Sequence, residues 1–194
     1  MHNANASPAR QTSTLGRTAS WGMTLALIVA GALLLTLSAK IKVPFWPVPM
    51  TMQPLAVLML GMIGGARIGT AAVLLYLAEG AVGLPVFTDT PLKGIGLAYM
   101  MGTTGGYLAG FVLAAAATGI LADRGYVRTI PSAFAVAALG MACIYAPGIA
   151  WLAQFIGADK AITFGFWPFA LGDALKIALA AIAVPSIAGA LAKR

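Results

Sequence analysis

Apolar residues occur in long runs along this chain, and short polar, glycine-rich or proline-rich breaks separate the runs. The runs cover residues 21–39, 53–63, 68–82, 104–122, 130–152 and 168–191. A helix needs about 20 mostly apolar residues to cross a bilayer. The second and third runs, divided by GGAR at 64–67, are short, so parts of them are expected to be buried in protein or to end below the membrane surface. The pattern predicts an all-α membrane protein with six transmembrane helices.

The segments around the runs differ in character. Residues 1–19 are polar, which predicts a disordered cytoplasmic tail ahead of a single membrane domain at 20–194. The first run is followed by Lys40 and VPFWPVP instead of a small-residue cleavage site, which indicates a retained anchor and not a signal peptide. The proline-rich residues 40–51 and the aromatic residues 83–102 predict ordered outer loops that cap a ligand pocket. A linker at 153–169 precedes the last run.

Composition supports membrane insertion over other classes. The chain is 60% hydrophobic and 9% charged, whereas a soluble domain is about a quarter charged. The net charge of +7 does not indicate nucleic-acid binding, because the basic residues stand singly or in pairs between apolar runs. The single Cys143 allows no internal disulfide or cysteine metal site, and the single His2 lies in the polar tail. A membrane enzyme is therefore disfavoured, since catalysis needs a nucleophile with a base or a metal cluster.

Six spans would place both termini on one side of the membrane, and the Lys and Arg bias indicates which side that is. The terminal side holds the larger group, and the opposite side holds Lys40, Lys42, Lys93 and Lys160. The larger group is Arg10, Arg17, Arg67, Arg124, Arg128, Lys193 and Arg194. Because Lys and Arg concentrate in cytoplasmic loops, both termini are expected in the cytoplasm. The two long loops and the start of the last helix then lie on the outer face.

The sequence GDALK at 172–176 puts two charges into the last apolar run. Positions three apart lie on one face of a helix, so Asp173 and Lys176 form one polar spot near the outer end. A charged residue near the centre of a membrane helix costs about 2.5–3.5 kcal/mol on insertion scales and commonly marks a functional site. Lysine suits a carboxylate and aspartate accepts from N–H groups, so a ligand carrying both groups would fit. A purely structural ion pair is the alternative.

Three further features are candidates for ligand or partner contacts. Gln53, at the top of the second run, either contacts a ligand or caps a helix end. Aromatic residues at loop and helix ends form an interfacial belt or stack on a flat ligand. Small residues spaced by four let helices approach closely, either inside the protein or against another subunit. These ridges are Gly22, Ala26 and Ala30 in the first run and Gly106 and Gly110 in the fourth.

Several ordered motifs together resemble the BioY family, the biotin-specific substrate-binding components of energy-coupling factor (ECF) transporters. They are VPFWPVPMTMQPLAVLMLG at 43–61, GLPVF at 83–87, KGIGLAYMMGTTGGYLAGF at 93–111 and LGDALK at 171–176. The resemblance covers nearly all of the chain after residue 20. One departure is Thr103, which stands where the family often has proline.

The resemblance implies biotin uptake across the bacterial cytoplasmic membrane, with no cofactor and no enzymatic activity in this chain. Asp173 would accept from the ureido ring, Lys176 would engage the carboxylate or the ureido oxygen, and Gln53, Phe87 and Tyr107 would complete the pocket. It also implies a transmembrane coupling protein, docked on Ala26 and Ala30, and two ATPases. The chain itself lacks a G-x-x-x-x-G-K-[ST] nucleotide-binding pattern. A stand-alone facilitator, a carrier of a related vitamin or precursor, and an assembly subunit without a ligand remain alternatives.

Overall fold

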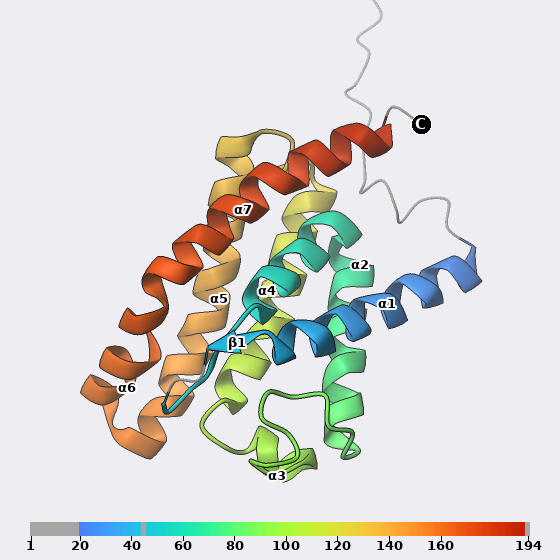
Figure 1. The fold of residues 1–194 in the computed structure, drawn as a ribbon. Coiled ribbons are helices and arrows are strands. Elements are labelled where there is room, and N and C mark those ends of the chain that lie inside the picture. Colours follow the sequence, from blue (N-terminus) through green and yellow to red (C-terminus); the bar gives the residue numbers. More distant parts are fainter. Residues whose placement is uncertain (1–19, 44–45, 193–194) are drawn as a thin grey trace, which may run out of the picture.

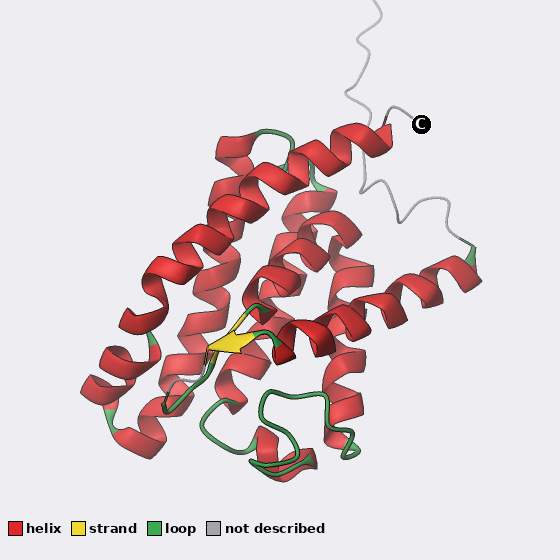
Figure 2. Cartoon of the chain, viewed as in Figure 1, coloured by secondary structure: helices red, strands yellow, loops and turns green. Residues whose placement is uncertain are grey.

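The computed structural model describes residues 20–43 and 46–192, in which loops connect the helices and one short two-stranded ribbon (Figures 1 and 2). The expected tail at 1–19 and the terminal Lys193 and Arg194 lie outside the described residues. The elements run in the order α1 (Trp21–Lys40), β1 (Lys42–Val43), β2 (Met50–Thr51), α2 (Gln53–Ala81), α3 (Gly96–Met100), α4 (Gly105–Asp123), α5 (Ile130–Ile156), α6 (Ala158–Gly165) and α7 (Trp167–Ala192).

Local sequence signals explain where several helices begin. The Ser20 hydroxyl accepts a hydrogen bond from the backbone N–H of Met23 at 3.3 Å and caps α1. Thr129 and Ser132 form a reciprocal capping box at the start of α5. Pro54 stands in the first turn of α2, where a missing N–H costs nothing because that donor would be unpaired anyway.

Five of the described helices are long and apolar enough to cross a membrane: α1, α2, α4, α5 and the part of α7 from Trp167 to Ile187. The multi-pass membrane class is thereby supported, although the expected number of spans was six. The difference lies in α2, whose 29 residues contain both the second and the third apolar run. The two runs are one continuous helix by hydrogen bonding, but they are not collinear.

Gly65 reverses the direction of α2 and divides it into two arms. Its φ of 74° and ψ of 178° are not helical, and a positive φ of this kind is readily adopted only by glycine. The arms then lie against each other, because a Cβ on Gly69 would be 2.6 Å from the carbonyl oxygen of Leu60. Asp123 at the end of α4 accepts a hydrogen bond from Ala66 N at 3.1 Å and so caps the second arm.

The loops also contain more regular structure than the sequence pattern indicated. In the proline-rich loop, Lys42–Val43 and Met50–Thr51 form a two-stranded antiparallel ribbon in which Lys42 pairs with Thr51. The loop at 83–102 contains the short α3. The linker at 153–169 is mostly helical, because α5 continues to Ile156 and α6 follows directly.

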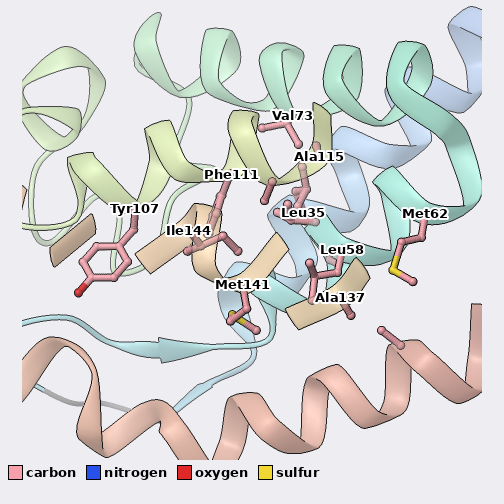
Figure 3. Packing of buried hydrophobic residues seen from close by; sticks show 14 of the residues in the cluster. Leu35, Leu58, Met62, Val73, Tyr107, Phe111, Ala115, Ala137, Met141 and Ile144 are labelled. Atoms are coloured by element: carbon pink, nitrogen blue, oxygen red, sulfur yellow. The ribbon is translucent and has the colours of Figure 1, made fainter. Parts of the chain in front are cut away.

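The core lies between α2, α4 and α5, with α1 and α7 packed outside it (Figure 1). Leu58, Val73, Ala115, Phe111 and Ile144 come from these three helices and belong to one buried cluster, part of which Figure 3 shows. Small residues allow the close approach. A Cβ on Gly106 would be 2.3 Å from Cβ of Trp151, and one on Gly110 would be 2.7 Å from Cα of Ile144. The ridge expected on the fourth run therefore packs internally, between α4 and α5.

A matched pair of glycine variants tests this packing. Gly106→Ala is expected to lower the free energy of unfolding by about 1–3 kcal/mol, because the new methyl group would overlap the α5 backbone at the Pro147 carbonyl. Gly22→Ala, also in a helix, has no neighbouring atom within 4 Å and should be neutral or slightly stabilising. Thermal unfolding in detergent measures both, and equal midpoints would show that α4 and α5 are not so tightly packed.

Candidate ligand site

A cavity of about 600 Å³, counted with its opening to solvent, lies inside the bundle near the ribbon and α3. Its walls come from α2, α4, α5 and α7, with further lining residues from α3, from α6 and from the two loops: Tyr99, Gly165, Val48, Pro49, Thr51, Phe87 and Thr88. All five ligand residues expected from the sequence line it: Gln53, Phe87, Tyr107, Asp173 and Lys176. They lie up to 123 positions apart in the chain, so only the fold brings them together.

The charged pair of α7 forms one polar end of the cavity. Asp173 and Lys176 are 5% and 6% exposed, and the Lys176 ammonium donates to Oδ1 of Asp173 at 2.6 Å. The hydroxyl of Tyr145, from α5, donates to Oδ2 of the same carboxylate. A buried charge requires a partner and hydrogen bonds to offset its desolvation. Here the opposite charge and the phenol meet that requirement while the pair still faces the cavity.

Gln53 belongs to a second, neutral polar group at the start of α2. Its Nε2 donates to the hydroxyl of Tyr76 at 2.7 Å, and its Oε1 accepts from the hydroxyl of Thr88 at 3.4 Å. Tyr76 is completely buried and comes from the second arm of α2. The reversal at Gly65 is therefore what brings Tyr76 beside Gln53, because a straight helix of this length would hold them far apart.

Aromatic side chains form the apolar walls of the cavity. Phe87 stacks on Tyr99 with ring centroids 4.9 Å apart and packs edge-on against Tyr76 at 5.3 Å. Tyr107 lies beside Tyr145, with centroids 6.3 Å apart, and donates its hydroxyl hydrogen to the carbonyl of Gly165 at 2.9 Å. Burial raises the pKa of Tyr99 above its ordinary 10.0, so this phenol stays neutral at physiological pH.

Sequence reasoning missed Tyr76, Tyr145 and Thr88. A signal existed for the two tyrosines, since each lies within an apolar run and a phenol buried in such a position needs a hydrogen-bond partner. That signal does not identify the partner, which depends on helix packing. Thr88 carries no distinguishing signal, because threonine in a loop is common. Trp46 and Trp167, two of the aromatic residues at loop and helix ends, are exposed and do not line this cavity.

The residues expected to dock a partner are placed on the surface. Ala26 and Ala30 are exposed on α1, and Gly22 has no atom within 4 Å of a Cβ built on it. The buried residues of α1 are Gly31, Ala32, Leu35, Ser38 and Ala39, all in its C-terminal half. In Figure 1 the N-terminal half of α1 accordingly reaches away from the bundle.

Fold and cavity together define a multi-pass membrane protein with an internal pocket for a small molecule. The model of the BioY family matches residues 10–193. The chain therefore belongs to the BioY family.

Curated relatives extend over most of this chain and of their own length. The chain is 40% identical over 162 residues to "Biotin transporter BioY" of Thermotoga maritima, covering 83% of this chain and 89% of that protein. It is 37% identical over 165 residues to "Probable biotin transporter BioY" of Pyrococcus horikoshii, covering 85% and 94%. The fold also resembles the crystal structure of the S-component for biotin from an ECF-type ABC transporter, with a TM-score of 0.74, 22% identity and coverage of 88% and 94%.

Proposed function

We propose that this protein takes up biotin across the cytoplasmic membrane and binds it in the cavity between α2, α4, α5 and α7. The observation that carries the proposal is the set of chemical groups that line the cavity. They are a buried ion pair, a separate neutral group of amide and hydroxyls, and aromatic walls. The names of the relatives, which are biotin transporters, support the same ligand and a transport role without enzymatic activity.

Each part of biotin has a chemical counterpart among the lining residues. The ureido ring offers two N–H donors, and each Asp173 oxygen keeps a lone pair beyond the one used by Lys176 or Tyr145. Lys176 has three N–H donors, of which Asp173 takes one, so it can also donate to the carboxylate or the ureido oxygen of the ligand. Phe87 and Tyr107 offer apolar ring surface for the bicycle, and Gln53 offers an amide.

In the membrane, the two arms of α2 would count as two segments. Together with α1, α4, α5 and α7 they give six, with both termini in the cytoplasm as the Lys and Arg distribution indicates. The lysines assigned to the outer side support this arrangement. Lys42 and Lys93 both bridge to Asp89, the latter at 2.9 Å, so the loops that carry them meet at one end of the bundle.

Energy for uptake would come from other chains. An ECF coupling protein with two ATPases is the expected partner, and the solved structure of similar fold is the S-component for biotin of an ECF-type ABC transporter. The exposed Ala26 and Ala30 of α1 offer a narrow apolar face on which a partner helix could pack closely. A stand-alone facilitator is the alternative, and a carrier of a biotin precursor is another.

Titration of the purified protein with biotin tests the proposal. We expect saturable binding and a rise in thermal midpoint, because a ligand at 100 times its Kd stabilises the folded state by about 2.7 kcal/mol. Desthiobiotin, titrated in parallel, distinguishes a precursor carrier, which would bind it at least as tightly. If calorimetry detects no heat of biotin binding and biotin does not raise the thermal midpoint, a biotin site in this cavity is contradicted.

A further inference from the structure

The C-terminal end of α1 is tied to the segment that forms one wall of the cavity. The Lys40 ammonium donates to the carbonyl oxygens of Pro85 at 2.8 Å and Phe87 at 2.9 Å. The hydroxyl of Thr88 donates to the carbonyl of Ala39 at 3.3 Å. These three contacts bridge 45 to 49 positions of sequence and join α1 to residues 85–88.

The tied segment carries two side chains that line the cavity, Phe87 and Thr88. Phe87 is 1% exposed and fits against Gly80, where a Cβ would be 2.0 Å from its ring. The single hydroxyl hydrogen of Thr88 is shared between the carbonyl of Ala39 and Oε1 of Gln53, at 3.3 and 3.4 Å. One of the two carbonyls that accept from Lys40 belongs to Phe87 itself, so loss of this contact would let the Phe87 ring move and loosen the wall.

Lys40 is the last residue of a helix that is only half embedded in the protein. The first half of α1 contains no buried residue, whereas its second half packs on α2, where a Cβ on Gly31 would be 2.7 Å from Cβ of Ala72. Lys40 does not line the described cavity, so its effect on a ligand must pass through residues 85–88. It stands between the exposed part of α1 and the cavity wall.

We propose that Lys40 is a positioning residue that holds the Phe87–Thr88 wall against the bound ligand and thereby sets how long the ligand stays. This inference rests on the proposed function, in which biotin occupies the cavity. The ion pairs of Asp89 with Lys42 and Lys93 lie one residue further along and do not involve a lining residue. Compared with Lys42 and Lys93, Lys40 is the lysine that hydrogen-bonds directly to a lining residue, at the carbonyl of Phe87.

The test compares the rates of biotin binding and release for the full chain in detergent. Lys40→Met keeps most of the length of the side chain but loses both donated hydrogen bonds, so dissociation should accelerate about tenfold while association changes little. Lys40→Arg keeps the charge and the donors, and its dissociation rate should stay within about threefold of the original because at least one bond can form. Lys160→Met, an exposed lysine of α6 with no ion pair in the described structure, is the matched control and should match the parent.

Thermal unfolding without biotin separates positioning from general destabilisation, since a merely structural role would lower the midpoint and leave the dissociation rate unchanged. If Lys40→Met does not accumulate as folded protein, Thr88→Val loosens the same wall by removing the hydrogen bonds to Ala39 and Gln53, and it carries the same expectation of faster release. An unchanged dissociation rate in Lys40→Met, or an equal acceleration in Lys40→Arg, would overturn the inference. Failure of the parent protein to bind biotin would instead contradict the proposed function.

Discussion

Replacing Lys176 with methionine is expected to reduce biotin affinity by about 10- to 150-fold. The reason is that a hydrogen bond from a charged donor, which is worth about 1.5–3 kcal/mol, would be lost. The same change should destabilise the fold by about 3–5 kcal/mol, because it leaves the Asp173 carboxylate buried without its opposite charge. Asp173 and Lys176 are both almost fully buried, so solvent cannot compensate for the lost partner. Calorimetric titration and thermal unfolding measure the two effects separately.

The double variant Asp173→Asn, Lys176→Met distinguishes a ligand site from a structural ion pair. Removing both charges should restore much of the stability lost in the single variants, because no unpaired buried charge remains. Binding should not recover, since the groups expected to meet the ligand are gone. Asp159→Asn and Lys160→Met, which remove exposed charges of α6, are the controls and should change neither quantity. Recovery of normal affinity in the double variant would leave the pair with a structural role alone.

Enlarging both small residues on the exposed face of α1 is expected to reduce biotin uptake by cells at least about tenfold, since bulk there blocks close helix–helix packing. The variant is Ala26→Leu with Ala30→Leu. Neither alanine lines the cavity, so the purified variant should bind biotin as the parent does. Uptake is measured with labelled biotin in cells that also express an ECF energising module.

The control for the docking variant is Ala135→Leu, which makes the same kind of substitution once, at an exposed position of α5. It should leave uptake unchanged. Normal uptake in the α1 variant would contradict docking through Ala26 and Ala30. If the parent protein takes up biotin equally well without the energising module, the stand-alone alternative is favoured.

How far sequence can predict the site depends on the kind of signal each residue carries. Asp173 and Lys176 were identifiable because a charge in an apolar run is costly and therefore conspicuous. For Gln53 the sequence left a ligand contact and a helix cap equally open. The choice of Gln53, Phe87 and Tyr107 as pocket residues depended on a family resemblance, since glutamine and aromatic residues at helix ends are common. Tyr145 was missed because its importance comes from the carboxylate of another helix, 28 positions away in sequence.

The hydrophobic pattern by itself determined the class of this protein, the approximate extent of its helices and the place where the charges fall. These properties depend on how each residue is solvated and on how long each apolar run is relative to the bilayer, and both can be read directly from the sequence. The tertiary structure alone decided that α2 turns back at Gly65, that Lys40 holds the backbone of residues 85 and 87, and that Tyr76 and Tyr145 each find a polar partner on a neighbouring segment. Such features depend on which surfaces meet when helices pack, and a pattern of apolar positions leaves that choice open.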